Sequence, residues 1–253
     1  MKTDVLYGIH SVREAIKAGR RKIFKVYVSE RRTSKRIDTT VGLAESRNIS
    51  VQRVSPETLR RTAGVEHHQG ICATVSAYPF VEISQILNSF YSEPNPPAVL
   101  LVDHMVDPQN LGALIRTALC VGMGAVFIPR DRSASPTAAV SKASAGALEH
   151  IRMCKVTNMI HAIRTLKHRG LWIVGLDHAA EASIYTTDLK VPLGMVVGGE
   201  EKGIRPLVKR HCDMLVSIPQ AHTVNSLNAS VAGAVAMYEM FRQRHEIEPI
   251  KDH

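Results

Sequence analysis

The sequence predicts an α/β protein with two units, a small amino-terminal α/β unit and a larger unit built on a parallel sheet. After Ala98, apolar runs of strand length alternate with helical segments, which is typical of parallel strands buried on both faces. A shorter alternation of the same kind fills residues 1–76. Between them, Glu93-Pro94-Asn95-Pro96-Pro97 cannot continue a helix or a central strand, so it reads as an interdomain linker.

Composition and these breaks set the expected domain boundaries. A chain of 253 residues accommodates one large or two modest domains. We expect a first domain at residues 1–76, an irregular linker at 77–97, a second domain at 98–245 and a polar tail at 246–253.

The first domain shows helix and strand signals in turn. A short helix is predicted around Val12 and Ile16, and residues 34–47 are also helical in pattern. Ser55 followed by Pro56 is a helix start, because serine caps the free amides and proline fits the first turn. The predicted strands are Ile23–Val28, Ile49–Val54 and Ile71–Val75.

The second domain has longer apolar strands and clearer helical periodicity. Its predicted strands are Val99–Val102, Ala125–Ile128, Trp172–Val174, Met195–Val197 and Leu215–Ile218. Its first helix repeats apolar residues at helical spacing at Leu111, Leu114, Ile115, Ala118 and Leu119. Its last helix does so at Leu227, Val231, Ala234, Val235, Tyr238 and Phe241.

The net charge of +9 is concentrated in the first domain. Residues 1–76 hold 15 basic and 7 acidic residues, which leaves a surplus of only one for the rest of the chain. Such asymmetry indicates that one domain meets a polyanion, although a merely solvated basic face is the plain alternative. The basic residues form two clusters around one strand: Arg20, Arg21, Lys22 and Lys25, then Arg31, Arg32, Lys35 and Arg36.

Other composition signals limit the partners and the compartment. The four cysteines are scattered singly without a Cys-x-x-Cys pair, which disfavours a zinc ribbon or a disulfide framework and fits a reducing cytosol. Buried, inert thiols are the simplest reading of them. No run approaches the roughly 18–20 apolar residues of a membrane span, and no secretory signal is evident. We therefore expect a cytoplasmic protein with no membrane or metal partner.

Three loops that follow strands carry unusual polar content. The first, Asp107–Gly112, leads to Arg116, which lies about 140° around the helix from Leu111 and so off its apolar stripe. Asn110 occupies a position where a helix cap is expected. The plain alternative is that Asn110 only caps the helix and Arg116 only meets solvent.

The second loop is Gly198-Gly199-Glu200-Glu201-Lys202-Gly203, directly after a predicted strand. Its glycines permit close approach of the backbone to a ligand, and Glu200 adds an acceptor. The spacing matches neither a Gly-x-Gly-x-x-Gly dinucleotide fingerprint nor a phosphate-binding P-loop. A tight strand-to-helix turn is the plain alternative.

The third loop, Ile218–Ser230, places Ser226, Asn228 and Ser230 at alternate positions where an apolar helix begins. Short polar side chains there bind free backbone amides or a ligand. In open α/β sheets, ligands bind where strands end and helices start. A capped helix start explains one of these residues but not all three.

Taken together, the three loops resemble the three signature motifs of the TrmH-type branch of the SPOUT RNA methyltransferases, in order and at matching spacing. Tyr7-Gly8-Ile9-His10 and His68-Gln69-Gly70-Ile71 resemble the small substrate-binding domain of its RlmB subgroup. Gln220, His222 and Asn225 depart from the family pattern, and Glu201 replaces a usual glycine.

The resemblance implies a fold, a cofactor and a reaction. It implies a second domain with a deep trefoil knot that binds S-adenosyl-L-methionine, and a homodimer. Its activity would be methylation of the ribose 2′-oxygen of a guanosine in large-subunit ribosomal RNA, bound by the first domain. The implied cofactor-binding residues are Gly198, Ile218, Leu227, Gly175, Leu176 and Gly203. The implied catalytic residues are Arg116, Asn110, Glu200, Ser226 and Asn228, although an arginine normally stays charged and is a poor base.

Three alternatives stay open at the level of sequence. A transfer-RNA ribose methyltransferase keeps the chemistry and changes the substrate. An RNA-binding assembly factor with an inactive methyltransferase domain would retain the fold alone. A nucleotide-binding oxidoreductase is the weakest alternative, because the dinucleotide fingerprint is missing.

Overall fold

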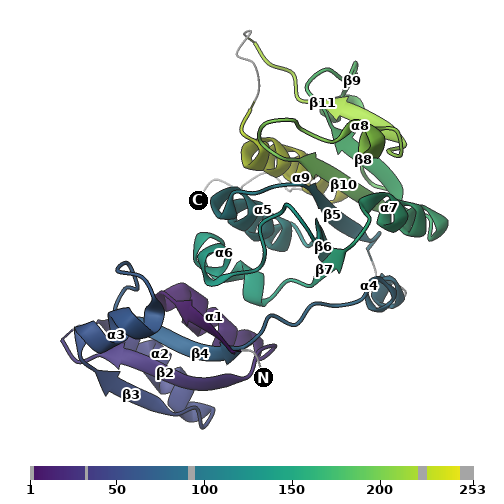
Figure 1. Cartoon of the computed structure of the whole chain (residues 1–253). Helices are drawn as coiled ribbons and strands as arrows, with labels where there is room; N and C mark the ends of the chain where they lie inside the picture. Colours follow the sequence, from purple (N-terminus) through teal and green to yellow (C-terminus); the bar gives the residue numbers. More distant parts are fainter. Residues whose placement is uncertain (1–2, 32–33, 91–94, 222–226, 246–253) are drawn as a thin grey trace, which may run out of the picture. The chain divides into compact units, whose positions relative to one another are not determined.

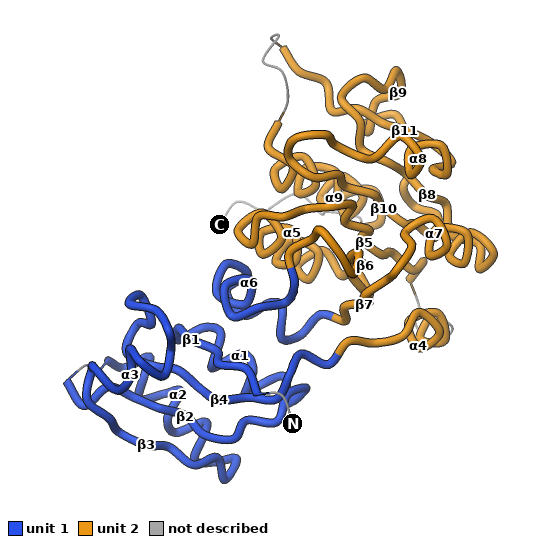
Figure 2. Tube along the Cα trace, viewed as in Figure 1, with its two compact units in different colours: residues 1–79, 135–151 blue, residues 80–134, 152–253 orange. Residues whose placement is uncertain are grey.

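The computed structural model describes residues 3–31, 34–90, 95–221 and 227–245. The chain forms two compact units, coloured separately in Figure 2. The first comprises residues 1–79 together with residues 135–151, and the second comprises 80–134 and 152–253. The chain therefore crosses between the units three times, and a segment from the middle of the sequence completes the first unit.

The first unit has a four-stranded sheet in the order β1-β4-β2-β3. The strands are β1 (Thr3–Tyr7), β2 (Ile23–Ser29), β3 (Val51–Val54) and β4 (Ile71–Ser76). β4 is antiparallel to β1 and β2, whereas β2 and β3 are parallel. The three predicted strands are present, but β1 was not predicted. This edge strand depends on pairing with β4, which lies more than sixty residues away, so its local pattern is a weak signal.

Helices cover the two faces of this sheet unequally. α1 (Ile9–Ala18) and α2 (Lys35–Ser46) share one apolar cluster with the sheet, which includes Leu6, Val12, Ile16, Val26, Ile37 and Ile71. α3 (Pro56–Ala63) packs on the other face. The predicted start of α3 is confirmed, because the Ser55 hydroxyl accepts from the Thr58 amide at 3.2 Å with Pro56 in the first turn.

The segment 135–151 is held in the first unit by a buried ion pair. It carries α6 (Ala138–Ala143) and a 3-10 turn (Ala147–Glu149). Arg21 Nε lies 2.9 Å from Glu149 Oε2, and each side chain is only 1% exposed. Burial raises the pKa of the Glu149 carboxyl, while Arg21 and the Ser141 hydroxyl oppose that rise. Such a pair persists in a protein interior only while both partners are present.

This ion pair corrects the expectation for the first basic cluster. Arg21 is buried against Glu149, and Arg20 donates to the Tyr78 hydroxyl and to the Ile151 carbonyl. Both arginines are therefore structural. Lys22 and Lys25 are the members of that cluster left to contact a polyanion.

The second unit is built on a seven-stranded sheet whose strands are all parallel, in the order β7-β6-β5-β10-β8-β11-β9 (Figure 1). The five predicted strands are present as β5 (Ala98–Asp103), β6 (Ala125–Pro129), β8 (Trp172–Leu176), β10 (Leu193–Gly198) and β11 (Met214–Ser217). β7 (Met153–Val156) and β9 (Ala182–Ser183) were not predicted. Both are short edge strands, too brief to show a period of their own.

The described α-helices of this unit are α4 (Ile83–Ser89), α5 (Pro108–Cys120), α7 (Met159–His168), α8 (Pro206–Lys209) and α9 (Ala229–Arg244). α4 lies where an irregular linker was expected, so that expectation was wrong. A capping box between Glu82 and Gln85 begins the helix, and Ile86 and Leu87 are buried in the core of the unit. The break in the chain is therefore shorter than residues 77–97.

The last helix, α9, buries a different face from the one its apolar residues predicted. Gly233, Ala236, Met237 and Met240 are buried, whereas Val231 is 48% and Tyr238 54% exposed. α9 is apolar nearly all the way round, so the sequence period could not select the buried side. An apolar stripe consequently stays open on the surface of the single chain.

Candidate active site at the carboxyl edge of the parallel sheet

A cavity of about 410 Å³ lies at the carboxyl ends of β8, β10 and β11, within the second unit. Loops after parallel strands meet at this edge, which is where open α/β sheets bind ligands. Five of the six predicted cofactor-binding residues line it: Leu176, Gly198, Gly203, Ile218 and Leu227. Glu200, Glu201 and Gln220 line it as well. Gly175, the sixth, is packed inside β8 instead.

The glycine loop forms one wall of the cavity and is folded tightly on itself. The Gly203 amide donates to the Gly199 carbonyl at 3.1 Å. A Cβ on Gly198 would lie 2.0 Å from the Gly203 carbonyl carbon, and one on Gly199 would lie 2.4 Å from the His104 oxygen. Only glycine fits at these two positions, so the loop keeps this tight fold only while both residues are glycine.

An ion pair with a buried carboxylate fixes the far end of this loop. The Asp103 carboxylate, 0% exposed at the end of β5, accepts from the Arg205 backbone amide at 3.0 Å. It also accepts from Arg205 Nε and Nη2, at 2.9 and 2.7 Å to Oδ1. The loop between Gly198 and Arg205 is thus anchored at both ends. No local motif in the sequence marks Asp103 or Arg205 as part of the site.

Beside the cavity, four polar side chains from the three predicted motifs form one network. Asn110 Nδ2 donates to Glu200 Oε1 at 2.8 Å, and Asn228 Nδ2 donates to Asn110 Oδ1 at 3.1 Å. The Ser230 hydroxyl lies 3.1 Å from Asn110 Oδ1 and 2.6 Å from Asn228 Oδ1. Residues 90 and 118 positions apart from Asn110 in sequence are therefore brought into direct contact with it.

The helix caps leave these side chains available. Asp107, not Asn110, caps α5, because its carboxylate accepts from the Gln109 amide at 2.9 Å. The expectation that Asn110 is the cap was wrong, and its side chain is free to bridge Glu200 and Asn228. Asn228 does cap α9 through Oδ1, while its Nδ2 donates to Asn110. Asn228 thus serves the helix and the site together.

The structure does not bring Arg116 into this network. Arg116 is exposed on α5, and among the described residues no hydrogen bond or ion pair is found for its guanidinium. It lies six residues beyond Asn110, about 9 Å along the helix and about 120° around it. Glu200 therefore orients Asn110 rather than Arg116. Ser226, His222 and Asn225 lie outside the described residues.

Two charged residues at the cavity were missed from the sequence. Asp177 and Lys209 line the cavity, and Lys209 Nζ lies 2.5 Å from Asp177 Oδ2. Partial burial raises the pKa of Asp177, but the bonds from Lys209 and the Ala179 amide outweigh it, so the net shift is downward. Asp177 directly follows β8, and that position at a strand end was the available signal.

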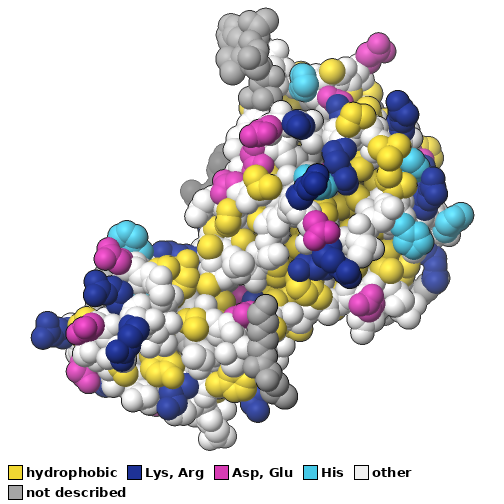
Figure 3. Space-filling view, viewed as in Figure 1, with side chains coloured by type: hydrophobic (Ala, Val, Ile, Leu, Met, Phe, Trp, Pro, Cys, Tyr) yellow, Lys and Arg dark blue, Asp and Glu magenta, His cyan; other side chains and the backbone are white. Residues whose placement is uncertain are grey.

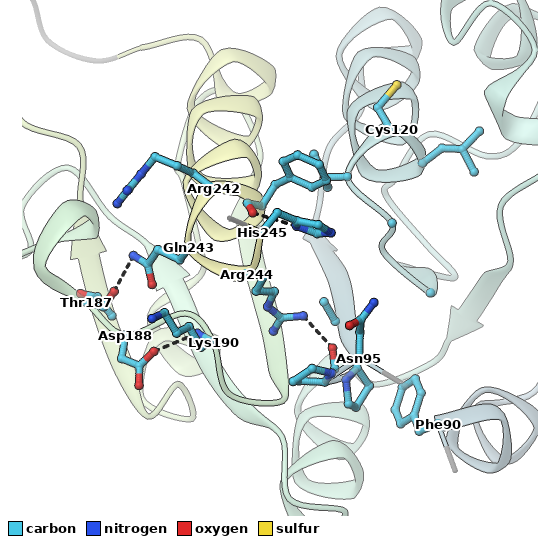
Figure 4. Close-up of a pocket in the computed structure, with 18 of the residues that line it drawn as sticks. Phe90, Asn95, Cys120, Thr187, Asp188, Lys190, Arg242, Gln243, Arg244 and His245 are labelled. Carbon is cyan, nitrogen blue, oxygen red and sulfur yellow. Dashed lines mark hydrogen bonds between the residues drawn. The ribbon is translucent and has the colours of Figure 1, made fainter. Parts of the chain in front are cut away.

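A larger cavity, of about 1130 Å³, lies at the opposite, amino-terminal ends of the strands (Figure 4). Arg244 stands in it and donates to the Pro96, Leu189 and Val191 carbonyls, which ties the end of α9 to this edge. Apart from Gly175 and Arg116, the predicted site residues that the structure describes lie at the other edge. Among the described residues no group of three metal-ligating side chains occurs, and no helix is long and apolar enough to cross a membrane.

Comparison with known families identifies the family to which this part of the chain belongs. The sequence model of the SpoU rRNA Methylase family matches residues 97–238, which contain the whole cavity and its polar network. The chain belongs to the SpoU methylase family. A second model, for the substrate-binding domain of RNA 2′-O ribose methyltransferases, matches residues 5–81.

Relatives of this SpoU-family chain match it over nearly its full length. The 23S rRNA (guanosine-2′-O-)-methyltransferase RlmB of Pseudomonas putida is 39% identical over 242 residues, covering 95% of this chain and 97% of that protein. The TrmH-family tRNA/rRNA methyltransferase YacO of Bacillus subtilis is 36% identical, covering 96% and 97%. The resemblance predicted from the three motifs is confirmed.

Solved structures show the same fold. AviRb of Streptomyces viridochromogenes, crystallised with AdoMet, superposes with a TM-score of 0.80 at 21% identity, over 96% of this chain and 90% of that one. The Aquifex aeolicus TrmH/SpoU tRNA-modifying enzyme superposes with a TM-score of 0.54, over 64% and 82%. The tRNA-modifying neighbour thus shares a smaller part of the architecture of this SpoU-family chain.

Proposed function

We propose that this SpoU-family protein transfers a methyl group from S-adenosyl-L-methionine to the ribose 2′-oxygen of a guanosine in 23S ribosomal RNA. The observation that carries the proposal is the joining of Asn110, Glu200 and Asn228 into one network beside a glycine-walled cavity. Full-length similarity to proteins named RlmB supports the guanosine and the ribosomal target.

The cavity of about 410 Å³ falls in the usual size range of small-molecule sites, and the chemistry of its walls suits the cofactor. The glycine loop, which has no room for Cβ atoms at Gly198 and Gly199, leaves backbone amides and carbonyls uncovered by side chains, and such groups suit the adenine and ribose. We assign this contact to the backbone at Gly198, Ile218 and Leu227, with Leu176 and Gly203 closing the cavity. When bound, the cofactor supplies an electrophilic methyl group on a positively charged sulfur.

The residues of the chain then have to place the ribose hydroxyl and manage its proton. Methyl transfer would form the O–CH₃ bond as the S–CH₃ bond breaks. The thioether would leave with the bonding electron pair, and the hydroxyl proton would pass to solvent water. Alignment of the two reacting atoms supplies much of the rate in such a displacement. Glu200 holds Asn110, which holds Asn228, and this network positions the nucleotide. Ser226 is assigned to the same polar shell.

We assign Arg116 the role of stabilising charge on the hydroxyl oxygen, and not the role of removing the hydroxyl proton. A guanidinium stays charged in proteins, so it stabilises the developing negative charge instead of acting as a base. Its exposed position on α5 leaves it accessible to an RNA strand.

Two properties of the architecture belong to the proposal. The carboxy-terminal chain forms a deep trefoil knot, with α9 packed against α5 and β10. The protein works as a homodimer through the exposed apolar stripe of α9, which includes Val231 and Tyr238. A stripe of that kind on a surface helix is typical of a covered interface.

The experiment is methyl transfer from radiolabelled cofactor to 23S rRNA and to tRNA, both from cells that lack the modification, followed by mapping of the modified nucleotide. We expect label at one 2′-O-methylguanosine of 23S rRNA. Label on tRNA alone would establish the tRNA methyltransferase instead. Binding of RNA without any transfer would establish an inactive assembly factor.

A further inference from the structure

The two faces of the amino-terminal sheet differ in how much of them is covered. Among the helices that the structure describes, α1 and α2, with 10 and 12 residues, share the apolar cluster of one face with Ala138 of α6, whereas α3, with 8, packs on the other. Eight helical residues span about 12 Å. Four strands are about 14 Å wide and several residues long, so α3 covers only part of its face.

The strand register shows which part of that face remains open. Tyr7, Cys72 and Tyr27 lie in one cross-strand row, and their side chains belong to the apolar cluster under α3. Two residues along the strands, Thr74 pairs with Lys25, on the same face of the sheet. Thr74 and Lys25 are half-buried and lie outside the cluster under α3, which extends along this row only to Val5 on the neighbouring β1.

This remaining area, here called the open strip, is defined by Lys22, Phe24, Lys25, Gln52 and Thr74. Lys25 Nζ lies 3.4 Å from Gln52 Oε1 and 6.0 Å from the centre of the Tyr27 ring. Lys22 Nζ lies 5.5 Å from the centre of the Phe24 ring. Among the described residues, neither lysine forms an ion pair with a carboxylate, in contrast to the neighbouring Arg21.

Phe24 is the residue of the open strip that packing does not account for. It stands at an irregularity in the register of β2, between Ile23 and Lys25, and is only half-buried. It belongs to neither of the two apolar clusters of the unit. Figure 3 shows Lys and Arg side chains interspersed with apolar ones on the visible face of this unit, at the lower left.

We infer that the open strip is a docking surface for single-stranded RNA, and this rests on the proposed RNA methyltransferase function. Unpaired bases stack on aromatic rings, and the adjoining phosphates meet lysines that have no acidic partner. A double helix offers no free base faces, so it does not use Phe24. The open strip thus holds nucleotides that flank the methylated one in sequence or in fold.

The test uses the full-length protein and a fluorescent single-stranded RNA of about 16 nucleotides, the upper site size of comparable surfaces. Phe24→Leu should weaken binding about tenfold, whereas Phe24→Tyr, which keeps the ring, should bind like the parent. Lys22→Gln/Lys25→Gln should lower the slope of log affinity against log salt by about 1.4, the value for two phosphates on a single strand. Thermal melts establish that each variant is folded.

The matched control is Lys190→Gln/Arg210→Gln, which removes two exposed charges from the second unit. It should leave affinity within about twofold at physiological salt, since charges outside the binding surface are largely screened. Equal losses in both double variants would overturn the inference, as would unchanged binding in Phe24→Leu or equal competition by duplex RNA.

Methyl transfer separates this inference from the proposed function. If the parent methylates ribosomal RNA, the open-strip variants should raise the KM for RNA and leave kcat unchanged. If the parent is active and the open-strip variants keep its KM for RNA, only the docking surface is ruled out. If the parent methylates no RNA, the proposed function is ruled out, whatever the binding data show.

Discussion

Asp103 and Arg205, which are 102 positions apart in sequence, meet through four hydrogen bonds at the edge of the parallel sheet. Asp103 is the last residue of β5, the strand next to β10, and Arg205 ends the loop that follows β10. The pair therefore joins two neighbouring strand ends and closes the glycine loop against the sheet. Glu200 lies inside that loop, so its contact with Asn110 depends on the pair.

Arg205→Ala should loosen the glycine loop and weaken cofactor binding. It leaves a buried carboxylate with one backbone donor, which costs about 1–3 kcal/mol; the cost is below that of a fully buried pair because Arg205 is 44% exposed. Chemical unfolding and calorimetric titration of the cofactor measure the two effects. Arg210→Ala, an exposed arginine nearby, is the control, and equal behaviour of the two variants would contradict the role of the pair.

Gly198→Ala should abolish cofactor binding. The new Cβ would stand 2.0 Å from a backbone carbon and 2.2 Å from a backbone nitrogen, so the loop has to move. Gly42→Ala is the control, because a Cβ there meets nothing within 4 Å and the site lies inside α2. That control should gain about 0.5–1 kcal/mol of stability. Normal titration of the cofactor into Gly198→Ala would show that the loop is not the wall of its site.

Arg116→Ala should lose methyl transfer by about a hundredfold to a thousandfold, the usual effect of removing one donor to a developing negative charge. Cofactor affinity should stay unchanged, because Arg116 lies outside the cavity lining. Initial rates at saturating RNA and cofactor measure the loss. Lys190→Ala, an exposed lysine at the opposite edge of the sheet, is the charge-matched control; full activity in Arg116→Ala rules out the assignment.

Asp177 should make the free energy of unfolding depend on pH in the acidic range. Its pKa is lowered in the folded protein, so its stabilising contribution is complete above the unfolded pKa of about 4 and is lost as the pH falls through the folded pKa. Asp177→Asn should therefore lose less stability than the parent as the pH falls below about 4. Urea unfolding at a series of pH values measures this, and parallel pH curves for the two proteins would refute it.

Much of the fold could be predicted from sequence patterns that extend over a few residues. The apolar runs of β5, β6, β8, β10 and β11 marked the central strands, because strands buried on both faces are continuously apolar. The three polar loops marked the carboxyl edge for the same local reason, since each follows one of these strands or begins a helix. The strands β1, β7 and β9 were not predicted, because they form through pairing with distant partners and not through a pattern of their own.

The sequence by itself determined the family, the positions of the main strands along the chain and the three polar loops that carry Asn110, Glu200 and Asn228, since these depend on motifs and short-range spacing. Only the tertiary structure decided which of them touch: it joined those three and left Arg116 apart. It also paired Asp103 with Arg205 and turned Arg21 inward to Glu149. Contacts of this kind join residues about a hundred positions apart. They depend on where strands are placed in a sheet, and no local period in the chain carries that information.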